Sequence, residues 1–178
     1  MGLTVEQFSN LYKALNTFGE QLVDETLSNM NKLKMSSSGK LAKSLEYDVS
    51  ESDGGLKLQF LMEEYGVYQD EGVSGTKKKY NTPFHYKDGG TRIRPPASAF
   101  NKWVVKKGLK GTRTKSGKFA PRKSIMFAVA TNIWKFGIKP KRFFSDAWDT
   151  MEQKLNSGFL DDATAIDIEK ALLMEFEK

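Results

Sequence analysis

The residues that could perform chemistry in this chain are few. The chain has one histidine, His85, and no cysteine, which leaves too few ligands for most transition-metal sites. A histidine that acts as a general base needs a positioned nucleophile and an acid that orients it. The only acid within residues 73–142 is Asp88, so we interpret His85 as a loop or interface residue.

Neighbouring carboxylates occur at Glu63-Glu64, Asp70-Glu71 and Asp161-Asp162. Adjacent positions on a helix point in different directions, so these pairs are badly placed to share a proton or a metal ion. We interpret them as solvated faces or as helix starts, where negative charge is favourable. A nuclease would need carboxylates clustered around a metal, and the sequence shows no local cluster of this kind.

The stretch from Gly111 to Lys118 looks like a phosphate-binding loop but departs from that motif at two points. Five residues separate its glycines instead of four, and Phe119 stands where the metal-binding serine or threonine should be. No apolar strand precedes it. The sequence therefore predicts that the protein is not an enzyme and that it holds no cofactor and no metal.

Positive charge, in contrast, is concentrated in the middle of the chain. Residues 73–142 hold 19 Lys and Arg and one acid, a net charge of +18. Residues 1–72 hold 6 basic and 12 acidic residues, and residues 143–178 hold 3 and 9, so each flank has a net charge of −6. This acid–base–acid pattern limits what the molecule can bind, and it allows copies of the molecule to bind one another.

Most of these basic residues fall in two expected loops, with aromatic residues interleaved. Basic residues neutralise phosphates, and aromatic rings stack on unpaired bases. Contact with nucleic acid, docking on acidic protein surfaces and simple solvation of the loops are therefore three open interpretations. No nucleic-acid fold signature is present, so sequence-specific reading of bases is not expected. The candidate contact residues are Lys77, Lys78, Lys79, Arg92, Arg94, Lys110, Arg113, Lys115, Lys118, Arg122 and Lys123.

Length and composition predict a soluble protein. With 178 residues, of which 39% are hydrophobic, the chain is long enough to bury a core. The start, Met1-Gly2-Leu3-Thr4, has no charged-then-apolar signal sequence, and no apolar run approaches the ~20 residues of a membrane span. We expect a protein that is made in a cytoplasm and contacts no membrane.

The first third of the chain predicts a long helix and then a β-hairpin. Residues 4–34 carry apolar residues at three- and four-residue steps, and Thr4 with Gln7 fits a capping box. Residues 44–62 alternate apolar and polar positions on both sides of Asp53-Gly54-Gly55, which is a turn signal.

Shorter helices are expected after the hairpin. Residues 63–71 predict a short helix, and residues 73–95 and 108–121 predict two long basic loops around a helix at 97–107. Pro121 then starts a helix that Gly137 stops, a further helix follows Pro140, and residues 161–178 predict an acidic amphipathic helix. The expected inward-facing residues are Phe100, Trp103 and Val104; Ile125, Val129, Ile133 and Phe136; and Ile166, Leu172, Leu173 and Phe176.

These elements predict an α+β fold with a long N-terminal helix, a small antiparallel hairpin, several C-terminal helices and two long basic loops. We expect residues 1–150 to form one α+β domain with the basic loops as insertions. Residues 151–178 are then an acidic helical extension.

Two short phrases resemble a known family. Residues 64–72, Glu-Tyr-Gly-Val-Tyr-Gln-Asp-Glu-Gly, resemble the "tyrosine, short spacer, acid, glycine" phrase of tail-completion and head–tail joining proteins of long-tailed bacteriophages. Residues 141–147, Lys-Arg-Phe-Phe-Ser-Asp-Ala, are similar to the Arg-Pro-Phe-then-Ala phrase of that family, with Phe143 in the place of the proline. The resemblance covers roughly residues 4–150.

The resemblance implies a non-enzymatic subunit of a ring in the virion neck or at the top of the tail. In that family the two phrases are structural, which implies that Tyr65 and Tyr68 pack beneath the sheet and that Gly72 permits a turn. Its partners would be further copies of itself, the neighbouring connector and tail proteins, and passing genomic DNA without sequence specificity. Its location would be the virion, and the host cytoplasm during assembly. The family-phrase residues are Tyr65, Tyr68, Gly72, Arg142, Phe144, Ala147 and Trp148, the last of which with Phe144 would anchor the returning helix.

Two functions follow from the sequence. The first is a ring-forming neck or tail-completion protein, in which an acidic patch of one subunit meets the basic loops of the next. The alternative is a non-sequence-specific nucleic-acid-binding protein that uses the basic loops.

Overall fold

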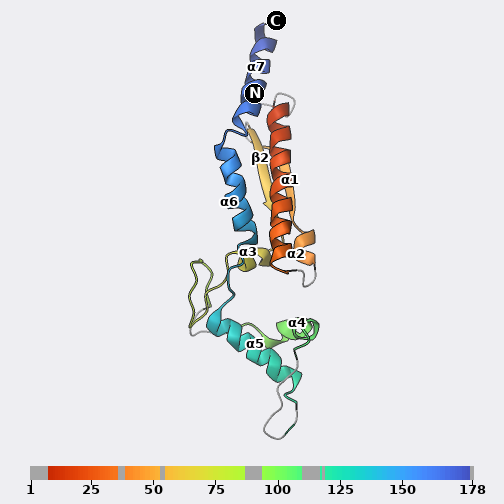
Figure 1. Cartoon of the computed structure of the whole chain (residues 1–178), viewed down its shortest axis with the longest axis vertical. Coiled ribbons are helices and arrows are strands. Elements are labelled where there is room, and N and C mark those ends of the chain that lie inside the picture. Colours follow the sequence, from red (N-terminus) through yellow and green to blue (C-terminus); the bar gives the residue numbers. More distant parts are fainter. Residues whose placement is uncertain are drawn as a thin grey trace. The chain divides into compact units, whose positions relative to one another are not determined.

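The computed structural model describes residues 8–35, 39–52, 55–86, 94–109, 117 and 119–176, with side chains as far as residue 170. It shows the mixed α+β fold that the sequence predicts, with a long N-terminal helix, a two-stranded antiparallel sheet and several C-terminal helices (Figure 1). The chain forms two compact units. Unit 1 consists of Met1–Gly66 and Phe143–Lys178, and unit 2 is Val67–Arg142.

Unit 1 contains the long helices and the hairpin. Strands β1 and β2 pair in register from Glu46 opposite Leu61 to Ser52 opposite Gly55, so two residues connect them. A predicted short helix, α3 (Tyr65–Asp70), spans the boundary between the units. The elements of unit 1 are α1 (Ser9–Lys32), α2 (Lys40–Lys43), β1 (Glu46–Ser52), β2 (Gly55–Leu61), α6 (Phe143–Asn156) and α7 (Asp161–Phe176).

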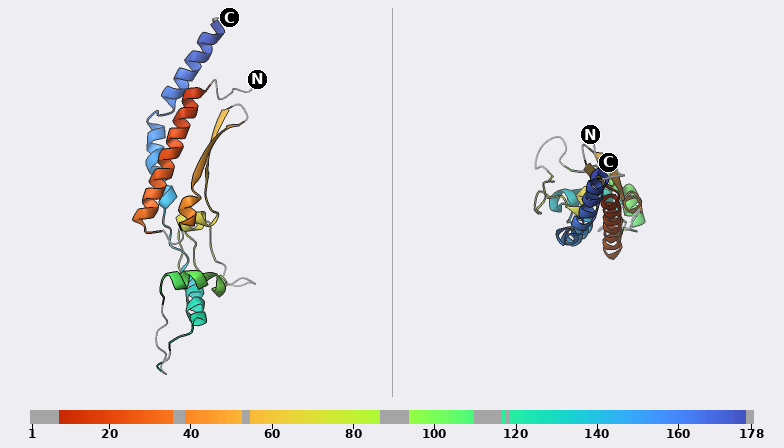
Figure 2. Two further views of the ribbon diagram at one scale, coloured as in Figure 1. Left: turned by 90° about the vertical axis from the view of Figure 1, so that its right-hand side faces the viewer. Right: turned by 90° about the horizontal axis from the view of Figure 1, so that it is seen from above.

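The core of unit 1 lies between α1, α6 and the hairpin. Phe18 and Leu22 of α1 pack against Ala147 and Met151 of α6, and Leu58 and Phe60 of β2 cover them. A second view shows the hairpin as a layer beside the helices (Figure 2). Full burial of a side chain as large as Phe18, Leu22 or Met151 contributes about 1.5–3 kcal/mol to stability. A second cluster joins Met30 of α1, Leu41 of α2 and Phe143 of α6.

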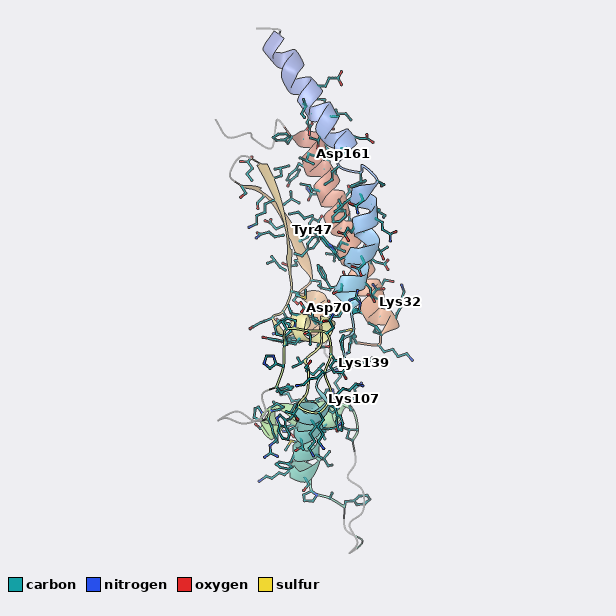
Figure 3. The ribbon with its side chains drawn as sticks, turned by 90° about the vertical axis from the view of Figure 1, so that its left-hand side faces the viewer. Lys32, Tyr47, Asp70, Lys107, Lys139 and Asp161 are labelled. Atoms are coloured by element: carbon teal, nitrogen blue, oxygen red, sulfur yellow. The ribbon has the colours of Figure 1, made fainter. Side chains whose placement is uncertain are left out.

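The hairpin approaches α1 most closely at Gly19. A Cβ atom at this position would lie 2.8 Å from Cγ of Tyr47, which is labelled in Figure 3. The glycine therefore lets the tyrosine ring lie directly against the helix backbone, and a larger residue there would push the sheet away.

Unit 2 is built around α5 (Arg122–Phe136), which begins after Pro121 and ends at Gly137 as predicted. A 3₁₀ turn, η1 (Ala97–Phe100), leads into α4 (Asn101–Lys106). Gly137 has φ 72° and ψ −164°, a backbone conformation that is almost confined to glycine. A Cβ atom at Gly137 would collide with the carbonyl oxygen of Val73, so the chain can cross here only because the side chain is absent.

The segment 72–86 is irregular, as predicted for the first basic loop, but it is tied down by hydrogen bonds. Val73 and Ile138 exchange both backbone hydrogen bonds, at 2.9 and 2.8 Å. The backbone N–H and the carbonyl of Ser74 bond Phe84 and Tyr86, and its hydroxyl bonds both backbone groups of Tyr80. Ser74 is buried, so it serves as the fixed point of this segment.

Several sequence predictions need correction. The first helix begins at Ser9, and the capping box at Thr4 and Gln7 lies outside the described residues. Trp103 and Phe136 are exposed although their helices form, because Val104 and Ala130 are the buried residues of α4 and α5. Ile166 is likewise exposed, and the neighbouring Asp167 is buried in its place. The turn residues Asp53 and Gly54 and the side chains of 171–178 lie outside the described part of the chain.

The boundaries of the compact units differ from those of the predicted domains. The second half of α6 and the whole of α7 belong to unit 1 together with α1 and the hairpin. The predicted boundary at residue 150 would instead fall inside α6, which runs unbroken from Phe143 to Asn156. The division into residues 1–150 and 151–178 stays a prediction.

Candidate interaction surface

The two units carry opposite net charge. Unit 2 holds 19 of the 28 Lys and Arg residues and 3 of the 22 acids, a net charge of +16. Unit 1 holds the other 9 basic and 19 acidic residues, a net charge of −10. At most three positive charges of unit 2 can be paired by acids of the same unit. The charge pattern read along the sequence is therefore also a division in space.

Lys77, Lys78 and Lys79 are exposed, and the backbone N–H groups of Lys77 and Lys78 cap the end of α5. The N–H groups of Thr76 and Lys77 donate to the carbonyls of Trp134 and Lys135, at 3.0 and 2.8 Å. These carbonyls belong to the last turn of α5, so no N–H group of the helix itself donates a hydrogen bond to them. Positive charge is favourable at this end of a helix, so part of the lysine cluster has a structural role. The ammonium of Lys78 also lies 5.3 Å from the centre of the Tyr80 ring.

Arg94 lies against the exposed side of α5. Its guanidinium carbon is 4.3 Å from the centre of the Phe127 ring, and Nη1 donates to Oγ1 of Thr131 at 3.4 Å. A cation over an aromatic face at an exposed site contributes about 0.5–1 kcal/mol. The contact also holds the arginine in place, so its charge is presented at a fixed position on unit 2.

Arg122 and Lys123 lie exposed in the first turn of α5, which contains no acid. Positive side chains at this end of a helix are opposed by the helix dipole. Their placement therefore costs stability in the isolated chain, which suits a surface that meets an anionic partner.

Lys141 lies in surroundings that disfavour its positive charge. Partial burial and the nearby positive charge of Lys107, labelled in Figure 3, lower the pKa of the Lys141 ammonium below its ordinary value. Its Nζ lies 3.5 Å from Oε1 of Gln69, a weak hydrogen bond. Like charges have thus been brought together in unit 2.

Five candidate contact residues lie outside the described part of the chain. They are Arg92, Lys110, Arg113, Lys115 and Lys118. The structure places the other six, and it brings together Lys77 to Lys79 at one end of α5 and Arg122 with Lys123 at the other.

The two family phrases meet near the ends of unit 2. The carbonyl of Asp70 accepts hydrogen bonds from the N–H groups of Lys141 and Arg142, at 3.1 and 3.0 Å. Gly72 has φ 78°, and a Cβ atom there would lie 2.7 Å from the carbonyl oxygen of Ile138. Gly72 therefore adopts a backbone conformation, with neighbours so close, that a residue with a side chain would not fit.

The tyrosines of the first phrase are placed differently from what the resemblance implies. Tyr65 and Tyr68 are both exposed and do not lie buried beneath the sheet. The Tyr68 ring packs edge-on against Phe84, with 4.7 Å between ring centres. Phe84 comes from the segment 72–86, so the ring that packs on Tyr68 lies outside the sheet.

Residues of the second phrase and Trp148 pack α6 into the core of unit 1. Ala147 is buried, and Phe144 packs its ring against Phe60 at 5.9 Å. Trp148 contacts Phe18 and Phe60 edge-on, at 6.2 and 6.4 Å. Phe143, which stands where the family has proline, is fully buried in the second cluster of unit 1. The departure from the family phrase is thus a core residue of this chain.

Asp167 is an important residue that the sequence did not single out. Its carboxylate accepts hydrogen bonds from the backbone N–H of Leu11, at 2.8 Å, and from the backbone and side chain of Asn10. These N–H groups lie in the first turn of α1, where no side chain of α1 itself acts as a cap. Burial alone would raise the pKa of this carboxyl, but the hydrogen bonds and nearby Lys170 outweigh it and lower the pKa.

Among the residues that the structure describes, His85 and the acidic side chains do not gather into a metal site. His85 is exposed, with Nδ1 lying 3.1 Å from the carbonyl oxygen of Pro83. Among the described residues, no group of three or more His, Asp or Glu side chains could hold a metal ion. None of the described helices combines the length and the apolar character that crossing a membrane requires.

Comparison with protein-family models, with curated proteins and with solved structures finds no match for this chain.

Proposed function

We propose that this chain is a structural protein of a phage virion, a ring-forming neck or tail-completion component that joins head and tail. The observation that carries the proposal is the separation of charge into a unit of net −10 and a unit of net +16. The negatively charged unit 1 of one copy is attracted to the positively charged unit 2 of the next copy. Such head-to-tail contacts close into a ring when the rotation between copies allows it.

The two family phrases support the same proposal. In support of it, Gly72 has the positive φ of a turn, and Phe144 and Trp148 pack α6 against Phe60 and Phe18. In this role the chain has no catalytic residues. Its partners are other copies, the neighbouring connector and tail proteins and passing genomic DNA, and it is located in the virion after assembly in the host cytoplasm.

The mass of the full-length chain by light scattering tests the proposal, alone and with a phage connector or tail ring. We expect a closed oligomer in at least one of these conditions, because rings of this kind sometimes form only on their partner. A chain that remains a monomer alone and also binds neither ring would refute the proposal.

A second candidate function is binding of nucleic acid without sequence specificity. It is favoured by the +16 charge of unit 2 together with exposed aromatic rings, of which Phe127 already carries Arg94. Arginine and aromatic side chains on a basic surface are the usual contacts to single strands. We expect affinity that falls steeply with salt, and weaker binding when Lys77, Lys78, Lys79, Arg113, Lys115 and Lys118 are replaced by Ala. Absence of binding at low salt would eliminate this function.

A further inference from the structure

Helix α7 presents an acidic and apolar stripe on the side away from α1. Asp167, Ala163 and Thr164 are the buried or half-buried residues of its described side chains, and Asp167 bonds the start of α1. Asp162, Ile166 and Glu169 follow one another at four- and three-residue steps and are all exposed. Residues at these spacings lie on one face of a helix. We call these three residues the α7 stripe; its centre, Ile166, is 45% exposed.

The end of α7 extends beyond the start of α1. Two views at right angles both show the last turns of α7 continuing past the first turn of α1 within unit 1 (Figures 1 and 2). Asp161, labelled in Figure 3, marks the opposite end of the helix.

Helix α5 in unit 2 presents a stripe of the opposite chemistry. Lys123 and Phe127 are one turn apart on the same face, and Arg94 lies over the Phe127 ring. All three are exposed, and Phe127 is 51% exposed although it is a large apolar side chain. We call these residues the α5 stripe. Each stripe thus has one exposed apolar side chain with two charges beside it.

We propose that the α7 stripe of one copy docks on the α5 stripe of the next copy. The inference rests on the proposed ring and names the surfaces that form its contact. Ile166 packs on Phe127, and Asp162 and Glu169 pair with Lys123 and Arg94. Charge complementarity identifies the occupant: the α5 stripe belongs to a unit of net +16, and the α7 stripe to a unit of net −10. A buried apolar contact surrounded by charged pairs is the usual composition of a protein interface.

Charge-reversed chains test the contact directly. The acid-reversed chain carries Asp162→Lys with Glu169→Lys, and the base-reversed chain carries Arg94→Glu with Lys123→Glu. Each full-length chain alone brings like charges together, so we expect the association constant, measured by light scattering, to fall at least about 100-fold. An equimolar mixture restores assembly, because reversed stripes then pair with reversed stripes and native stripes with native ones.

Matched controls carry the same change of charge elsewhere in the same unit. Glu20→Lys with Asp24→Lys changes two exposed acids of α1, and Lys102→Glu with Lys106→Glu changes two exposed lysines of α4. We expect both controls to assemble with less than a threefold change. Phe127→Ser removes the apolar contact without altering charge, and we expect about tenfold weaker association. Circular dichroism checks that each variant is folded.

The outcomes separate this inference from the proposed ring. If both reversed chains assemble like the native chain, the stripes are not the contact and the inference fails while the ring stands. If the base-reversed chain loses only duplex DNA binding, the α5 stripe is a nucleic-acid surface and the inference is wrong. A mass of one chain in every sample, measured both alone and with a phage connector or tail ring, refutes the inference, because no copy then contacts another. Binding of that monomer to a connector would still uphold the proposed function.

Discussion

Unit 1 and unit 2 are each stabilised internally by a different kind of contact. In unit 1, apolar side chains from α1, α6 and β2 interdigitate around Phe18 and Leu22, and neither residue retains more than 2% exposure. In unit 2 the buried apolar side chains described are Val73, Val104 and Ala130, all of them small. Its irregular segment is instead fixed by backbone hydrogen bonds and by the close approach of Gly72, Gly75 and Gly137 to other backbone atoms.

The difference teaches where each unit is sensitive to substitution. A unit stabilised by side-chain volume is weakened when volume is removed. A unit stabilised by backbone contact is weakened when a side chain is added. Charge explains part of the contrast, since 19 basic residues in unit 2 leave few positions for a large apolar core.

Phe143→Ala is the change with the largest expected effect on this comparison. Phe143 is fully buried between Met30 and Leu41, so its loss leaves a cavity in unit 1. We expect the free energy of unfolding to fall by about 3–5 kcal/mol. Hydrogen exchange should increase in α1 and α6 while the amides of Val73 and Ile138 keep their protection. Leu33→Ala, which removes an exposed side chain, is the control; equal losses in both units would contradict the comparison.

Gly137→Ala tests unit 2 in the opposite direction. The new methyl group is forced into a glycine-only conformation and against the carbonyl of Val73. We expect a loss of at least about 1–3 kcal/mol from the backbone conformation alone. The amides of Val73 and Ile138 should exchange faster, with α1 unaffected. Gly108→Ala also has positive φ but meets no neighbouring atom, so it should cost less. Equal costs at the two positions would show that the backbone crossing adds no stability.

Asp167→Asn sharpens the comparison by testing a polar contact inside the unit that depends on apolar packing. The carboxylate bonds the first turn of α1, and an amide offers only one acceptor in its place. We expect a loss of about 1.5 kcal/mol, read as faster exchange of the Leu11 amide. Glu169→Gln, an exposed change on the same helix, should leave that amide unaffected.

The same carboxylate predicts a dependence on pH. Because its pKa is lowered in the folded chain, the stability it contributes is complete above the unfolded value of about 3.9. That stability is lost as the pH falls below this value toward the folded pKa. Thermal melts between pH 3 and pH 6 should show a smaller acid destabilisation for Asp167→Asn than for the native chain. Parallel curves would mean that the pKa of Asp167 is the same in the folded and the unfolded chain.

Tyr68→Leu has the smallest expected effect. The edge contact with Phe84 links α3 to the tied segment of unit 2, and a leucine keeps only its apolar part. We expect a loss of about 0.5–1 kcal/mol, seen as a lower denaturant midpoint for unit 2. Tyr65→Leu is matched, since among the described residues Tyr65 packs on no aromatic ring. A larger loss for Tyr65→Leu than for Tyr68→Leu would show that the Tyr68–Phe84 contact is not the stabilising contact of this phrase.

The sequence predicted unit 1 better than unit 2, and the reason is physical. Helix and hairpin periods in α1 and residues 44–62 record which side chains are buried, so a core of side chains is readable. The hydrogen bonds of Ser74 that fix segment 72–86 produce no apolar periodicity in the sequence, because they are made by a hydroxyl and by backbone groups. Apolar periodicity places Trp103, Val104 and Phe136 inward, but only Val104 of these is buried, and the small Ala130 is the buried residue of α5.

The candidate interaction surface was predicted in part. The charge block and the residues Lys77 to Lys79, Arg94, Arg122 and Lys123 were visible as composition. The pairing of Arg94 with Phe127 joins residues 33 positions apart, and no local pattern encodes it. Asp167 lies 156 positions from Leu11, and a buried acid in an acidic helix cannot be distinguished by sequence from its solvated neighbours.

Because unit 2 is inserted between the two halves of unit 1, synthesis on the ribosome separates them in time. Residues 67–142 are made after α1 and the hairpin and before α6, a delay of 76 residues. At about 5–20 residues per second that is roughly 4–15 seconds. During this interval Phe18 and Leu22 lack Ala147 and Met151, the partners that bury them in the finished unit. During synthesis, α1 thus exposes an apolar surface to which chaperones can bind until α6 is made to cover it.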